Sequence, residues 1–228
     1  MIALIILVIL AITALVVVRA IKLQEEKERD RRLNQRKIKV QADFLTEVIN
    51  SVEPLTPTKL IIKLLNDEII KLLKGISALD KIPQPYLVSS IERAQARSDE
   101  LASDDSQNKT NYMKENATQI KYAQLQLKEA IRALHRIHQK NIITDAELEA
   151  FEKELLWSHL MVSVMSYIGQ GQEFILLDDQ TTAQNYFKKA QELLTQSTHA
   201  DPRRVKMIDE LTDMIEGTRD VISEHLLN

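Results

Sequence analysis

Residues 165–194 read MSYIGQGQEFILLDDQTTAQNYFKKAQELL, and apolar side chains recur there near a period of 3.6 on both sides of Asp178 and Asp179. Small residues fall where two helix backbones would approach each other, and aromatic residues fall beside them. The pattern predicts two antiparallel helices that reverse direction at the two aspartates. The positions that carry this packing are Tyr167, Gly171, Phe174, Ala183, Phe187 and Ala190.

The spacing of these six positions resembles the tetratricopeptide repeat, a helical hairpin of about 34 residues. The resemblance covers residues 164–197. Gln170 stands where the family prefers an aliphatic residue, Thr195 stands where it often has proline, and no second clean copy lies one repeat away. The resemblance implies a binding module that takes a peptide or a helix in a groove and has no chemistry of its own. A generic helical bundle is the alternative. A weaker echo of the pattern consists of Ala123, Leu127, Lys128, Ala130 and Leu134.

The whole chain of 228 residues has the composition of an ordered helical protein. It has 44% hydrophobic residues, four glycines, five prolines and no cysteine, which excludes disulfides, thiolate zinc sites and cysteine nucleophiles. Strict alternation of apolar and polar residues is absent over any useful length, so the expected fold class is all-α. The expected helices span residues 20–52, 57–79, 86–102, 112–140, 144–177, 180–197 and 202–226, with loops at 80–85 and 103–111.

Residues 2–18 form a continuous apolar run whose single polar member is Thr13. At 1.5 Å per residue the run approaches the roughly 30 Å of a bilayer core, so it predicts a transmembrane anchor over residues 1–21. A helical stalk over 22–53 and an all-α domain over 54–228 follow. The basic flank is Arg19, Lys22, Lys27, Arg29, Arg31, Arg32, Arg36, Lys37 and Lys39.

By the positive-inside rule this flank predicts a single-pass inner-membrane protein with its N-terminus outside and its domain in the cytoplasm. The alternatives are a signal anchor with a translocated domain and a peripheral protein. The apolar arc of residues 57–79 has lysines at its edges, which is typical of a core helix and also of a helix on a membrane surface.

No set of residues predicts an active site, a cofactor or a metal. His135 and His138 lie three residues apart without the glutamate of a zinc-protease helix, and the GQGQ of residues 169–172 lacks the context of a phosphate loop. Residues 40–228 carry 29 acidic and 21 basic side chains, which argues against nucleic acid as a partner.

Together these features predict a non-enzymatic, membrane-anchored cytoplasmic scaffold or adaptor with a helical protein-interaction domain. The expected partners are the membrane and other proteins, and a homo-oligomer is left open. The alternatives are a periplasm-facing module that assists exported proteins and a lipid-binding protein that remodels membranes.

Overall fold

The computed structural model describes residues 2–80, 84–103 and 109–226; the side chains of residues 2–17, 20 and 224 lie outside the description. Helices make up all of the regular structure in the described residues, so the all-α prediction is confirmed. The predicted loops at 80–85 and 103–111 fall partly on residues 81–83 and 104–108, which lie outside the described residues.

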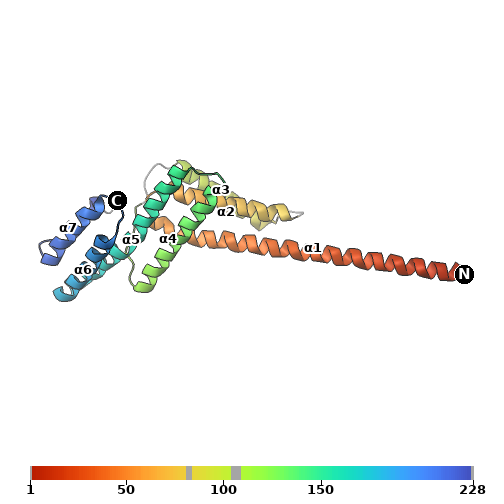
Figure 1. Cartoon of the computed structure of the whole chain (residues 1–228), viewed down its shortest axis with the longest axis horizontal. Coiled ribbons are helices and arrows are strands. Elements are labelled where there is room, and N and C mark those ends of the chain that lie inside the picture. The colour runs from red at the N-terminus through yellow and green to blue at the C-terminus, as the bar shows by residue number, and fades with distance from the viewer. Residues whose placement is uncertain (1, 81–83, 104–108, 227–228) are drawn as a thin grey trace.

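The first helix, α1 (Ile2–Val52), extends far beyond the other helices (Figure 1). No glycine or proline interrupts it after residue 18, which accounts for its length. From Ala42 onward one face of the helix is buried by the other helices, whereas most described side chains before that point are exposed. The helix ends in the short 3₁₀ turn η1 (Glu53–Leu55), which contains Pro54.

The expected transmembrane anchor, and the single-pass inner-membrane location built on it, are contradicted. Among the residues that the structure describes, no helix is long and apolar enough to cross a membrane. From Arg19 to Lys39 the helix carries thirteen charged side chains, and a charge is costly in hydrocarbon. The side chains of residues 2–17 and 20, on which most of the anchor prediction falls, lie outside the described residues.

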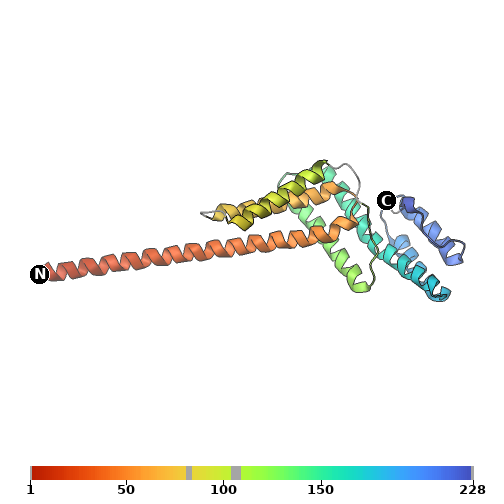
Figure 2. The same cartoon turned by 180° about the vertical axis from the view of Figure 1, so that it is seen from behind.

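Helix α2 (Lys59–Leu79) folds back against α1, and α3 (Pro85–Ser103) packs against α2 (Figure 2). The apolar arc of α2 is buried in this layer, as expected of a core helix. The helix begins at Lys59 and not at Pro57, because Thr58 is still extended and forms the N-cap. The fully buried residues of this arc are Ile61, Ile62 and Leu65.

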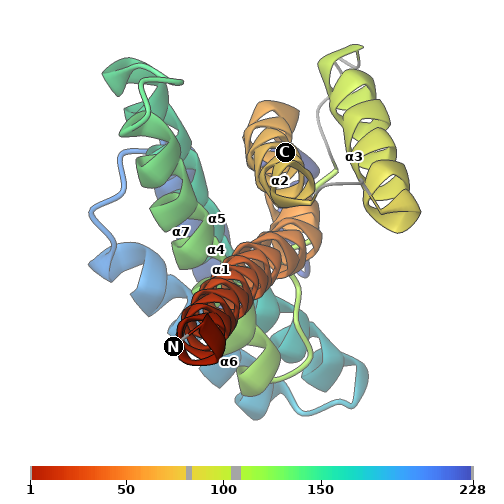
Figure 3. The same ribbon diagram turned by 90° about the vertical axis from the view of Figure 1, so that its right-hand side faces the viewer.

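The remaining helices follow one another as antiparallel neighbours: α4 (Ala117–His138), α5 (Asp145–Leu176), α6 (Gln180–Gln196) and α7 (Arg203–Glu216). Viewed along α1, the α2–α3 pair lies on one side of that helix and the α4–α5 pair on the other (Figure 3). The 32-residue α5 packs on both α4 and α6, so it is the central helix of this layer.

Two further predicted boundaries are wrong. The fourth helix starts at Ala117 and not at residue 112, because the Asn116 side chain accepts a hydrogen bond from the Gln119 backbone N–H at 3.0 Å and caps the helix there. The last long helix ends at Glu216, because Gly217 takes a left-handed conformation with φ of 76°. Within the part of the chain that the structure describes, the 3₁₀ turn η2 (Glu224–Leu226) is the only helical structure beyond it.

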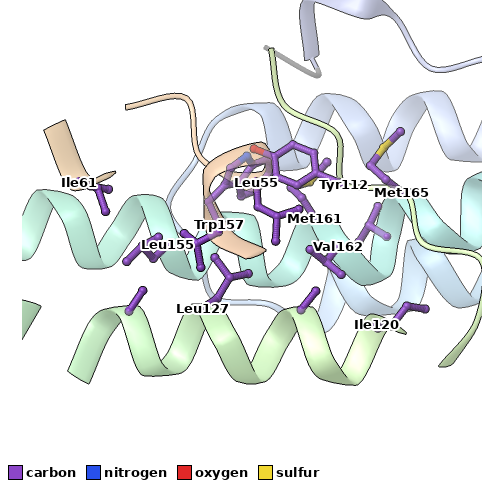
Figure 4. Close-up of a cluster of buried hydrophobic side chains, with 14 of the residues drawn as sticks. Leu55, Ile61, Tyr112, Ile120, Leu127, Leu155, Trp157, Met161, Val162 and Met165 are labelled. Atoms are coloured by element: carbon purple, nitrogen blue, oxygen red, sulfur yellow. The ribbon is translucent and has the colours of Figure 1, made fainter. Parts of the chain in front are cut away.

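One core joins the two layers. Side chains from the α1–α2 turn, α4 and α5 meet around Leu127, Leu155 and Trp157 (Figure 4). Trp157 is buried there. The position of α5 is therefore fixed from both sides, and α5 also forms the floor of the surface groove described next.

Candidate functional site

The structure brings the small and aromatic residues of the predicted hairpin together between α5 and α6. Gly171 lies directly against Phe187: a Cβ atom added at Gly171 would be 2.4 Å from Phe187 Cε1. Ala183 and Ala190 are fully buried on the same face of α6. Small side chains at these positions therefore allow the close approach of the two helices.

Tyr167 and Phe174 lie at the edge of this interface and are only partly buried. Both contact Tyr186, which the sequence pattern does not single out. The Phe174 and Tyr186 rings stack with centroids 5.5 Å apart, and the Tyr167 ring lies 6.3 Å from that of Tyr186. Tyr186 directly precedes Phe187, and an aromatic pair at adjacent helix positions is a signal that one ring faces the core and the other its edge.

The reversal between the two helices occurs at the predicted aspartates. Asp178 has a positive φ of 62°, a conformation that aspartate tolerates better than most residues. Asp179 caps α6 by accepting a hydrogen bond from the Thr182 backbone N–H at 3.0 Å. Hydrogen bonds from the Thr182 side chain and backbone lower the pKa of Asp179, so its carboxylate stays ionised in this turn.

A groove of about 800 Å³ runs along the other side of α5, between α4 and the C-terminal end of α6. We call it the α5 groove. Its apolar surface comes from three leucines, of which Leu156 is 50% exposed. The connection between α6 and α7 closes one end. The lining includes Gln124, Lys153, Leu156, Leu160, Leu193 and His199.

Polar contacts hold the walls of the α5 groove in place. The Gln124 side-chain amide donates hydrogen bonds to the His159 carbonyl oxygen at 3.2 Å and to Ser163 Oγ at 2.9 Å, which fixes α4 against α5. On the opposite wall, His199 Nδ1 accepts from the Asp201 backbone N–H at 3.2 Å, so its other nitrogen, Nε2, carries the proton and donates to the Lys153 carbonyl oxygen at 2.9 Å.

Behind His199, the wall is supported by an ion pair that stacks on the core tryptophan. Arg203 lies over the Trp157 ring at 5.0 Å and binds the Asp201 carboxylate through two nitrogens, at 3.0 and 2.8 Å. Burial alone would raise the pKa of Asp201, but hydrogen bonds and charge from Arg203 hold it below its ordinary value. The α6–α7 connection is thus anchored and presents a fixed edge to the groove.

The α5 groove carries charges of both signs. Lys153 and Asp201 line it, and each has a partner: Lys153 Nζ lies 2.7 Å from the Glu149 carboxylate, and Asp201 binds Arg203. The charge of Lys128 reaches His159 from α4. Burial, and then this lysine, lower the pKa of His159, so its imidazole is neutral at pH 7. Its Nε2 atom is buried and has no hydrogen-bond partner among the described residues.

The basic flank of α1 does not contribute to the α5 groove. Its residues are mostly exposed along the extended part of the helix, and Arg32 pairs with Glu28 at 3.8 Å. Three members of the flank, Arg32, Arg36 and Lys39, line a separate hollow of about 420 Å³ between α1 and the α2–α3 pair.

The described residues contain no group of histidines and carboxylates suited to a metal. His135 and His138 bind separate carboxylates on α5: His135 contacts Glu152, and His138 Nε2 lies 2.8 Å from Asp145. The glycines of GQGQ serve packing, because Gly169 lies against Met113 and Gly171 against Phe187. These candidates thus have structural partners of their own.

Fold and groove together define an all-α protein with a preformed, leucine-lined surface groove. Comparisons with family models, with curated proteins and with solved structures find no match to the chain.

Proposed function

We propose that the protein is a non-enzymatic scaffold or adaptor that binds a peptide segment of a partner protein in the α5 groove. The single observation that carries the proposal is the half-exposed Leu156 on a groove floor that two further leucines extend. A leucine at this position contributes little to the core and offers its apolar surface to a ligand. The tetratricopeptide-like spacing of the adjacent hairpin supports the same class of function.

The groove chemistry specifies the ligand class. A volume of about 800 Å³ lies within the range of sites that bury most of a small ligand or a few side chains of a peptide. One or two aliphatic side chains of a ligand would pack against Leu156, Leu160 and Leu193. Lys153 pairs with Glu149 at 2.7 Å on an exposed surface, and we propose that it exchanges this partner for a carboxylate of the ligand. The proposed ligand is therefore a short segment that combines aliphatic and acidic residues.

Pre-organisation is the second support. Hydrogen bonds at Gln124 and His199 hold both walls, so these two side chains have little freedom left to lose on binding. Binding a peptide in such a groove needs no chemical step. This agrees with the role of Gln124 and His199, whose hydrogen bonds position the walls of the groove.

Selection of peptides from a random display library against the full chain tests this function. Enriched peptides should share aliphatic residues next to Asp or Glu. Lys153→Glu should weaken their binding by about tenfold, close to 1.4 kcal/mol, whereas Lys121→Glu, on exposed α4 surface outside the groove lining, should leave it unchanged. Failure to enrich any sequence, or equal binding by both variants, would overturn the proposal.

A further inference from the structure

The turn between α5 and α6 lies at the end of the molecule far from the N-terminus (Figure 1). A cluster of apolar side chains is exposed there. Leu176 is 86% exposed and Leu177 is 72% exposed, the two largest values among the large apolar residues with described exposure. We call Ile175, Leu176 and Leu177 the tip. Asp178 and Asp179 give the tip its fixed shape, because one holds the left-handed turn and the other caps the next helix.

The residues around the tip are acidic. Glu173, Asp178 and Asp179 flank the leucines directly, and residues 173–228 carry eleven acidic and six basic side chains. Two adjacent leucines presented to water in this way are costly for an isolated molecule, because each exposes an apolar side chain that burial would stabilise. A basic apolar hollow is the surface that would complement the tip.

Such a hollow lies on another part of the same chain. A groove of about 550 Å³ lies between α1, α2 and the C-terminal end of α4, and we call it the α1 groove. Phe44, Leu45, Leu72 and Ala133 supply its apolar lining. Arg136 and Lys140 supply its cationic edge; Glu68 also lines the groove and pairs with Lys140, so the lining has two positive charges and one negative charge. It is distinct from the α5 groove, since the two share no lining residue.

The surface that leads to the α1 groove is also basic and partly apolar. Exposed Leu33 and Val40 fall on the same face of α1 as Phe44, since seven and four residues are close to whole helical turns. Residues 19–39 carry nine basic and four acidic side chains. An acidic body lying along α1 would meet opposite charge over this length, which steers association.

We propose that the tip of one copy docks in the α1 groove of a second copy, so that the chains associate head to tail. The occupant is a second copy because this chain itself displays the matching acidic leucine surface. The contact joins two different patches, so each copy keeps one free tip and one free groove, and growth continues unless a ring closes. The inference goes beyond the proposed peptide binding and does not rest on it.

Complementary variants test this arrangement in the full chain. The tip variant combines Leu176→Asp with Leu177→Asp, and the groove variant combines Phe44→Asp with Arg136→Glu. All four positions are exposed, so both variants should keep the helical circular dichroism and the cooperative melting of the parent. By sedimentation velocity the parent should grow with concentration, and each variant alone should remain a single chain. The equimolar mixture should form a dimer and nothing larger, because only one tip–groove pair remains intact.

Three results would overturn the proposal: a parent that stays a single chain at every concentration, variants that associate as the parent does, or a mixture that remains single chains. Loss of association in the tip variant alone would indicate a tip-to-tip dimer and would also overturn it. Because the chain has no cysteine, cross-linking adds a placement test. A short bis-maleimide should join a Leu177→Cys copy to a Gln139→Cys copy at least tenfold more than to a Leu125→Cys copy. Equal yields would contradict docking in the α1 groove.

Discussion

The Glu154 carboxylate on α5 accepts two hydrogen bonds from Thr58, one from its backbone N–H at 3.1 Å and one from its hydroxyl at 2.5 Å. The Thr56 hydroxyl donates to the same carboxylate. One side chain of α5 therefore accepts hydrogen bonds from both threonines of the turn between α1 and α2. Through it the helix that forms the floor of the α5 groove is fixed to the other layer of the molecule.

Replacing Glu154 should loosen the attachment between the layers. Glu154→Ala removes the carboxylate to which the Thr58 N–H and the buried Thr56 hydroxyl donate, so we expect the free energy of unfolding to fall by about 2–4 kcal/mol. Chemical denaturation followed by circular dichroism measures the change. Glu149→Ala, on the exposed face of the same helix, is the matched control and should leave the midpoint unchanged. Equal effects of the two substitutions would refute the role given to Glu154.

Two glycines should respond to alanine with opposite signs. At Gly171 the added methyl meets the Phe187 ring, so Gly171→Ala should destabilise the fold by about 1–3 kcal/mol. At Gly75, within α2, an added Cβ atom would have no heavy atom within 4 Å apart from the neighbouring backbone of its own helix. Gly75→Ala should therefore stabilise the fold by about 0.5–1 kcal/mol. Thermal melting of the two variants measures both. Combining Gly171→Ala with Phe187→Leu should recover part of the loss, and a neutral Gly171→Ala would argue against close packing there.

Acid should weaken the fold through His159. Burial, followed by the charge of Lys128, lowers the pKa of this histidine in the folded chain below the value of about 6.5 that it has when unfolded. As the pH falls through about 6.5 the unfolded chain therefore takes up the proton first, and stability is lost. Denaturation midpoints measured from pH 7.5 to pH 5 should show this slope. The slope should be smaller in His159→Gln, and an unchanged slope would contradict the assignment.

The α4 cap offers a local test of helix boundaries. Asn116→Ala removes the side-chain acceptor of the Gln119 N–H and should lower the free energy of unfolding by about 1 kcal/mol. Asn116→Asp keeps an acceptor there and should retain the stability. Urea titrations compare the three chains, and a helix that starts earlier, near residue 112, would make both substitutions neutral.

The helical class and the hairpin turn could be predicted from the sequence, because both depend on the spacing of residues that are close along the chain. The apolar residues of α2, α4, α6 and α7 recur at helical spacing on one face of each helix. Asp178 and Asp179 mark a reversal that needs no distant partner. The end of α7 was also within reach, since Gly217 follows the last periodic apolar residue and is a common C-terminal signal.

The contacts between the layers and the grooves could not be predicted from the sequence, because they depend on which helix faces pack against each other. Nothing near Glu154 in the sequence indicates that its partner lies about a hundred residues earlier, at Thr56 and Thr58. Leu156 and Leu155 differ only in the direction they face, yet the first is half-exposed on the α5 groove and the second is fully buried. Hydropathy alone does not separate such neighbours.

The most direct measurement of the central claim is the affinity of a selected peptide for two leucine variants of the full chain. Leu156 and Leu125 are equally exposed, at 50% and 51%, but only Leu156 lines the α5 groove. By isothermal titration calorimetry, Leu156→Glu should weaken binding by at least tenfold, and Leu125→Glu should bind as the parent does. Equal affinity of the two variants would contradict peptide binding in the α5 groove.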